Sequence, residues 1–189
     1  KSIFFIIYIS ISALVILIWS LYSSSALLVF LIVASYHFGR EDTSFLHEGN
    51  AHIDQVFYLI KGSIIIFSPL FFQFDDTLKI FEILMLSKNF IIFIKEEHWL
   101  INVCLFLSIL GYFYFIFKNK LEDFEILLLD LLSIIILNYI FSPLIAFTIY
   151  FCFLHSIRHI ISISYELNKI DFSKGVKIFV RKALPLTII

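Results

Sequence analysis

The sequence predicts an all-α membrane protein, a polytopic bundle of six to eight transmembrane helices that forms a single integral membrane domain over residues 1–189. Apolar residues make up 61% of the chain and charged residues only 15%, and the mean hydropathy is +1.00. A soluble domain is about half apolar and about a quarter charged. The apolar residues also gather in runs long enough to cross a bilayer. This composition argues against a water-soluble globule, a disordered tail and a nucleic-acid-binding protein.

The first apolar run is too long for one transmembrane helix. No Asp, Glu, Lys or Arg occurs in residues 2–39, and a single helix of that length would measure about 57 Å against a bilayer core of about 30 Å. We therefore expect two helices with a break at residues 20–25, where serine hydroxyls can bond freed backbone groups and Trp19 and Tyr22 can lie at the membrane interface. Residues 40–55 are expected to form the first polar loop.

Four further spans are expected after that loop. The first of them contains Lys61 and Pro69, and the third contains Asp130. These spans cover residues 56–74, 98–117, 124–141 and 143–165.

Residues 78–94 are ambiguous, because Lys79, Glu82 and Lys88 interrupt an otherwise apolar stretch. A short span, a re-entrant element and an interfacial amphipathic helix all fit this pattern. The orientation of the chain before residue 78 depends on which of them is formed.

The end of the chain predicts sidedness. Residues 166–182 carry five Lys or Arg against two acidic residues, which favours a cytoplasmic position under the positive-inside rule and a multi-pass protein of the cell membrane. Residues 184–189 are expected to open another span. Because the sequence begins at Lys1 without Met, we expect a fragment truncated at both ends.

Three histidines stand out because they lie in or next to apolar segments. His155 and His159 fall inside the last complete span, and His37 ends the first uncharged run. Polar groups at membrane depth are costly and usually face a cavity or one another. Residues four apart on a helix lie on one face, so both imidazoles of the pair can reach one metal ion. A third ligand from His37 would leave positions open for dioxygen or water.

The other histidines, His47, His52 and His98, belong to polar or boundary segments. Histidines in such positions are usually solvated or interfacial, so we expect no ligand role for these three.

Three buried charges are expected to be paired. Lys61 and Asp130 both fall inside apolar spans, so an interhelical salt bridge would remove two isolated charges at once. Arg158 is expected either to pair with Glu41 or Asp42 or to orient a ligating imidazole by a hydrogen bond.

At these residues the sequence resembles the Brp/Blh family of membrane β-carotene 15,15′-dioxygenases. The resemblance rests on residues 35–39 (Ser-Tyr-His-Phe-Gly) and 155–159 (His-Ser-Ile-Arg-His). Lys61-Gly62, the downstream Pro69 and residues 182–187 (Lys-Ala-Leu-Pro-Leu-Thr) also resemble the family pattern.

The resemblance implies an Fe(II) enzyme that cleaves β-carotene with dioxygen at its central 15,15′ double bond and releases two molecules of retinal. It implies His37, His155 and His159 as metal ligands, with no catalytic residue beyond them. A further histidine in a His-Gly-Ala-like motif is expected upstream of Lys1.

A site within the lipid bilayer suits this substrate, because β-carotene dissolves in lipid. Aromatic side chains can line a tunnel that fixes which double bond reaches the metal. The candidates are Tyr36, Phe38, Phe151 and Phe153.

The alternative hypothesis is a membrane transporter or a non-catalytic membrane protein, in which Lys61 and Asp130 form a charge relay or a structural pair. A di-iron desaturase would need about eight histidines, and this chain has six.

Overall fold

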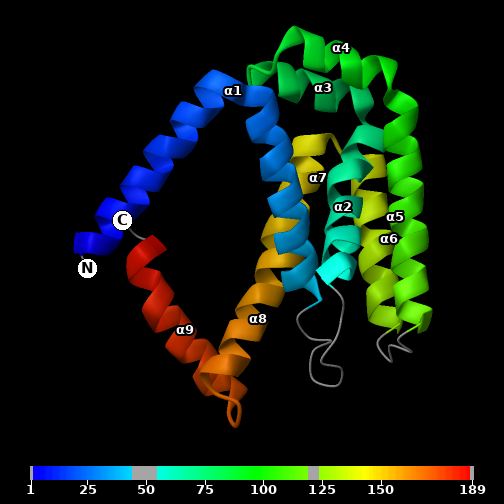
Figure 1. Ribbon diagram of the computed structural model, residues 1–189. Coiled ribbons are helices and arrows are strands. Elements are labelled where there is room, and N and C mark those ends of the chain that lie inside the picture. The colour runs from blue at the N-terminus through cyan, green and yellow to red at the C-terminus, as the bar shows by residue number, and fades with distance from the viewer. Residues whose placement is uncertain (1, 44–54, 119–123, 188–189) are drawn as a thin grey trace.

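The computed structural model describes residues 2–43, 55–118 and 124–187, and these residues form helices and short turns without any strand (Figure 1). This confirms the all-α fold. In chain order the helices are α1 (Ser2–Asp42), α2 (Gln55–Phe72), α3 (Phe74–Ile83), α4 (Lys88–Glu96), α5 (His98–Lys118), α6 (Phe124–Ile140), α7 (Pro143–Ile149), the π-helix η2 (Tyr150–His155), α8 (Ser156–Leu167) and α9 (Phe172–Thr187).

Within the described parts of the chain, four helical segments are long and apolar enough to cross a membrane. They are Phe5–Asp42, Gln55–Phe72, His98–Lys118 and Pro143–Leu167, the last of which joins α7, η2 and α8. Helix α6 is shorter, at 17 residues, and α1 is bent into two arms. Counting α6 and both arms gives six helical segments, the lower end of the predicted range, and their crossing of a bilayer stays a prediction.

The break predicted at residues 20–25 is confirmed as a kink in α1. Tyr22 has non-helical backbone angles, φ −139° and ψ 53°, and Figure 1 shows α1 bent into two diverging arms. Of the serines expected to bond freed backbone groups, Ser20 does so, donating to the carbonyl of Leu17 at 2.8 Å.

Two other serines and a tryptophan of the kink bond to a different element, the turn between α3 and α4. These long-range contacts fix the kink against one end of the bundle. They run from Trp19 Nε1 to the carbonyl of Leu84 (3.1 Å), from Ser23 Oγ to the carbonyl of Met85 (2.8 Å) and between the hydroxyls of Ser24 and Ser87 (3.1 Å).

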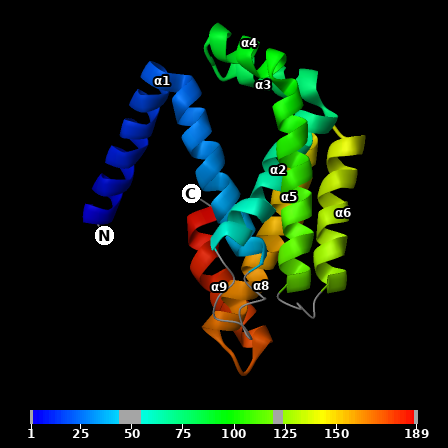
Figure 2. The same cartoon turned by 45° about the vertical axis from the view of Figure 1, so that its right-hand side comes forward.

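Residues 78–94 do not form a span. They belong to two helices of 10 and 9 residues, α3 and α4, each about 15 Å long and so about half of a bilayer core. Figures 1 and 2 show both helices lying across one end of the bundle, with α2 leading to them and α5 leading away. This favours the interfacial alternative, because both short helices divide polar from apolar residues around their circumference. The C-terminal ends of α1, α5 and α8 and the N-terminal end of α2 lie at the opposite end of the molecule.

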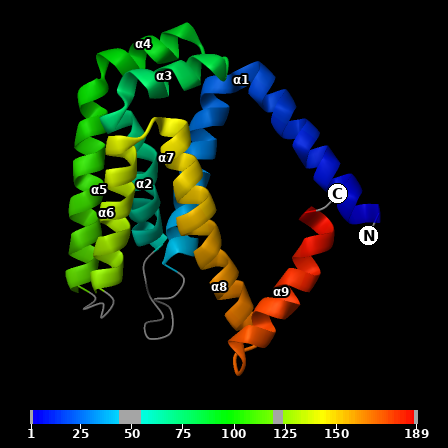
Figure 3. The ribbon, with the colours of Figure 1, turned by 180° about the vertical axis from the view of Figure 1, so that it is seen from behind.

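Most of the polar stretch at residues 166–182 lies in one amphipathic helix, α9, which is described as far as Thr187. The start of a further span at residues 184–189 stays a prediction. Helix α9 packs closely on α8: a Cβ built on Gly175 would lie 2.0 Å from the carbonyl oxygen of Ser164. Figure 3 shows α9 and the first arm of α1 on the side of the molecule away from α5 and α6.

The tightest packing in the bundle joins the second arm of α1 to α2. A Cβ on Gly39 would lie 1.8 Å from the carbonyl oxygen of Tyr58, and one on Gly62 would lie 1.7 Å from that of Ser35. Ser35 and Gly39 form a small-xxx-small pattern, which lets helices in a membrane approach backbone to backbone. This contact brings the end of α1, where the candidate site lies, directly against Lys61.

Candidate metal centre

A π-helical turn shapes the site. Tyr150–His155 form the π-helix η2 between α7 and α8, at the span in which the sequence predicts the histidine pair. In an α-helix, residues five apart are about 140° apart around the axis, whereas the i→i+5 bonding of a π-helix places them in adjacent turns on one side. Tyr150 and His155 therefore both reach the same residue, Asp42 at the end of α1.

The structure brings the three predicted histidines together. The ring centroid of His155 lies 5.7 Å from that of His37 and 6.4 Å from that of His159. His155 is buried, while His37 and His159 are exposed. No three His, Cys, Asp or Glu side chains within the described ranges converge closely enough to hold a metal ion as they stand. Metal binding would have to draw the exposed rings of His37 and His159 towards His155.

Two neighbouring carboxylates of α1 bind the histidine pair. His155 Nδ1 lies 3.0 Å from Asp42 Oδ1, and His159 Nδ1 lies 2.9 Å from Glu41 Oε2. The sequence predicts these acidic residues only as partners of Arg158, and both imidazole contacts go beyond that prediction. One feature of the sequence could have indicated the contact between Glu41 and a histidine. Glu41 follows His37 by four residues and therefore lies on the same helix face.

Asp42 is the centre of a buried ion cluster. Its side chain is fully buried and accepts a hydrogen bond from the Tyr150 hydroxyl at 2.6 Å. Arg158 Nη1 lies 3.5 Å from Asp42 Oδ2, and Lys61 Nζ lies 4.0 Å from it. This confirms the predicted pairing of Arg158 with Asp42.

Asp130 of α6 completes the cluster by pairing with both Lys61 and Arg158. The predicted Lys61–Asp130 salt bridge is thereby confirmed. Two cations face two carboxylates, so apart from the imidazole the cluster carries no net formal charge. Its members come from α1, α2, α6 and α8, which ties four helices together at the candidate site.

The substitution Lys61→Met is expected to destabilise the protein by about 3–5 kcal/mol, because removing one partner leaves buried charge uncompensated. Chemical unfolding in detergent micelles measures this loss. The matched control is Lys79→Met, which breaks an exposed ion pair with Asp76 (side chains 70% and 48% exposed) and should cost about 1 kcal/mol or less. Equal effects of the two substitutions would contradict the assignment of the cluster as a buried, paired unit.

Aromatic rings continue the line of the histidine pair along the same helix. Phe147 and Phe151 stack with centroids 5.8 Å apart, and Phe151 and His155 stack at 5.6 Å. With His159, whose ring is nearly parallel to that of His155, these residues form a ladder of four rings at a spacing of four residues. Phe147 and Phe151 are 46% and 41% exposed. These two rings therefore lead along the helix from its exposed surface to the buried imidazole of His155.

Two of the four predicted lining residues lie beside His155. Phe151 stacks on the His155 ring, and Phe38 meets it edge-on with centroids 4.9 Å apart. Tyr36 instead packs against Tyr58 of α2, and Phe153 is 62% exposed. The last two predictions are therefore not supported by contacts at the imidazole.

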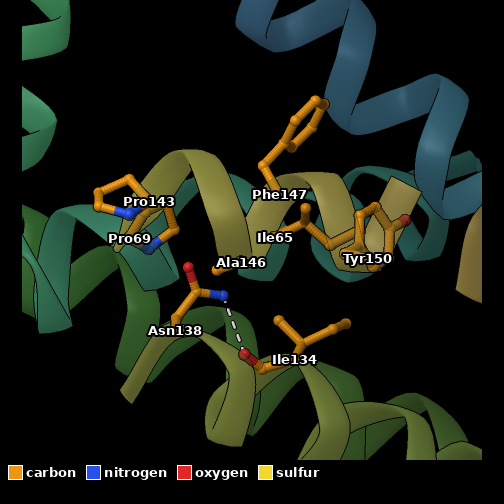
Figure 4. A pocket seen from close by; sticks show the side chains of 8 residues that line it. All are labelled: Ile65, Pro69, Ile134, Asn138, Pro143, Ala146, Phe147 and Tyr150. Carbon is orange, nitrogen blue, oxygen red and sulfur yellow. Dashed lines mark hydrogen bonds between the residues drawn. The ribbon is translucent and has the colours of Figure 1, made fainter. Parts of the chain in front are cut away.

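A small cavity lies next to the ion cluster, between α2, α6 and the span that joins α7 to η2 (Figure 4). Its volume is about 20 Å³, which suffices for one water molecule and for no larger ligand. The amide of Asn138 at its wall donates to the carbonyl of Ile134 at 2.9 Å. The cavity is lined by Ile65, Pro69, Ile134, Asn138, Pro143, Ala146, Phe147 and Tyr150.

The remaining histidines play no part in this arrangement where they are described. His98 begins α5 and packs on Phe74, with ring centroids 4.0 Å apart. His47 and His52 lie outside the described residues.

Comparison with known proteins agrees with the predicted resemblance. The sequence profile described as Beta-carotene 15,15′-dioxygenase matches residues 2–189. The chain belongs to this family. A curated relative, the Beta-carotene 15,15′-dioxygenase of Uncultured marine bacterium 66A03, is 27% identical over 187 residues. The match covers 96% of this chain and 62% of the relative, so the chain spans less than two thirds of the relative's length. No solved structure matches the chain.

Proposed function

We propose that the protein cleaves β-carotene with dioxygen at the central 15,15′ double bond and releases two molecules of retinal. Membership of the family supports this proposal. The structural observation that carries it is the meeting of His37, His155 and His159 at one place, with carboxylates on the pair. One β-carotene and one dioxygen give two retinals, so both oxygen atoms end in product aldehydes.

The donor set fits a non-haem Fe(II) ion. Neutral imidazoles suit iron, and contact of one ring nitrogen with a carboxylate is typical of metal-bound histidines. His37, His155 and His159 would hold the ion, with the exposed side chains of His37 and His159 moving towards His155. When bound, Fe(II) supplies the activation of dioxygen.

The chain's own residues would orient the polyene. The ladder of Phe147 and Phe151 leads along the helix to the buried ring of His155, and Phe38 borders that ring from α1. A flat apolar polyene can stack on such rings and exclude water from the reacting double bond. Because the outer rings are exposed on an apolar helix, the substrate can arrive from the lipid bilayer without crossing water.

We place the protein in the cell membrane as a multi-pass protein. The apolar helices support this location. The end of the molecule that holds Arg40, Lys118 and the turn after α8 is the cytoplasmic end under the positive-inside rule. The candidate site then lies towards the cytoplasmic side, because His37 is five residues before the end of α1 at Asp42 and His159 contacts Glu41 there.

Co-expression of the full-length gene in a β-carotene-producing bacterium tests the proposal, with pigment loss and retinal measured by chromatography. Retinal from the unsubstituted gene, and none from a His159→Ala variant of equal expression, is the expected result. Intact β-carotene in both strains would overturn the proposal and favour the transport hypothesis.

A further inference from the structure

We infer that Glu41 and Asp42 are positioning residues that present the histidine pair to the metal, an inference that rests on the proposed function. Each carboxylate binds the Nδ1 of one imidazole, Asp42 that of His155 and Glu41 that of His159. Adjacent residues of α1 thus reach two residues one turn apart on the crossing helix.

The contacts determine the tautomer of each ring. An ionised carboxylate has only acceptors, so the imidazole must donate its Nδ1–H. Asp42 also receives the Tyr150 hydroxyl proton and faces Lys61 and Arg158, all of which require the ionised form. In the neutral ring, Nε2 is then the nitrogen left with a lone pair, and it is the one available to a metal.

The two carboxylates differ in how firmly they are held. Asp42 is fully buried and is fixed by contacts from α2, η2 and α8. The Glu41 side chain is 25% exposed, so water competes for it. His155 should therefore be the rigidly placed ligand of the pair, and His159 the adjustable one.

Cobalt binding tests this inference without depending on turnover. The purified full-length protein in detergent micelles is stripped of metal and titrated with Co(II), whose visible absorption reports the number and geometry of its ligands. We expect Asp42→Asn to lower Co(II) affinity about 10- to 100-fold and to change the absorption spectrum. Glu41→Gln should have a smaller effect, about tenfold or less, because its contact is partly hydrated.

Asp130→Asn is the matched control. It removes a carboxylate of the same ion cluster, but Asp130 pairs with Lys61 and Arg158 rather than with an imidazole. We expect this variant to lose stability while keeping the Co(II) spectrum and affinity within about threefold of the unsubstituted protein. If Asp42→Asn does not fold, Glu41→Gln, at the more exposed position, decides the question by its own shift in affinity.

The outcomes separate the two proposals. Unchanged Co(II) spectra and affinities in both carboxylate variants would overturn the positioning role while leaving the metal centre intact. Equal losses in Asp42→Asn and Asp130→Asn would also overturn it, because a general loss of the ion cluster would then account for the effect. No Co(II) binding by the unsubstituted protein would overturn the proposed metal centre itself.

Discussion

The substitution His155→Ala is expected to lower retinal formation by more than about 100-fold, beyond the usual cost of losing a residue that only orients a ligand. His155 is the middle ring of the three, 5.7 Å from His37 and 6.4 Å from His159. Its removal leaves only His37 and His159 as metal ligands and takes away the hydrogen bond between His155 and Asp42. Retinal measured by chromatography in the β-carotene-producing bacterium gives the result.

The control for this substitution is His98→Ala. His98 lies at the start of α5 and packs on Phe74, so its loss should leave retinal formation within about twofold, as for other replacements away from special features. Retinal formation that survives His155→Ala, or falls equally in both variants, would contradict the assignment of His155 as a ligand.

The substitution Gly62→Ala is expected to disrupt the packing of α1 on α2 and to destabilise the fold. The new Cβ would lie 1.7 Å from the carbonyl oxygen of Ser35 and 2.4 Å from its carbon, and backbone atoms cannot move aside as a flexible side chain does. The second arm of α1 must separate from α2, which should cost more than about 3 kcal/mol. Thermal unfolding in detergent measures the loss, and retinal formation should fall with it because Asp42 and Lys61 are carried apart.

Gly111→Ala provides the matched comparison on α5. The nearest atom to its Cβ would be Cδ1 of the Ile60 side chain, at 3.1 Å, which can shift by a small change of rotamer. We expect this variant to unfold within a few degrees of the unsubstituted protein. Equal tolerance of both substitutions would contradict the backbone-to-backbone packing of α1 on α2.

The positions of the helices could be predicted from sequence because long apolar runs and their polar interruptions are strong signals. The kink at Tyr22 and the pairing of Lys61 with Asp130 are confirmed. His155 lies next to both His37 and His159, and metal binding by these three residues stays a prediction. The kink could be predicted because an uncharged run of this length is too long for one transmembrane helix. The salt bridge could be predicted because a polar group left alone among apolar residues is costly and requires a partner.

The details of the site were beyond prediction for a related reason. Lipid and protein core are both apolar, so the long helices carry little sign of which face packs inward. The contacts of Glu41 and Asp42 depend on how α1 and α8 are rotated about their own axes. The π-helix Tyr150–His155 has no composition signal of its own, although it brings Tyr150 and His155 to one carboxylate. Whether residues 78–94 span the membrane depends on the length of the helices they form. An apolar stretch with scattered charges does not reveal that length.

Metal removal from the purified full-length protein tests directly whether iron is required for the cleavage of β-carotene. Protein stripped of metal and supplied with β-carotene and oxygen should form no retinal, and Fe(II) should restore two molecules of retinal for each β-carotene consumed. Zn(II), which has no redox chemistry, should not restore it. Undiminished retinal formation by the metal-free protein, or products of unequal length, would contradict central cleavage at an iron held by His37, His155 and His159.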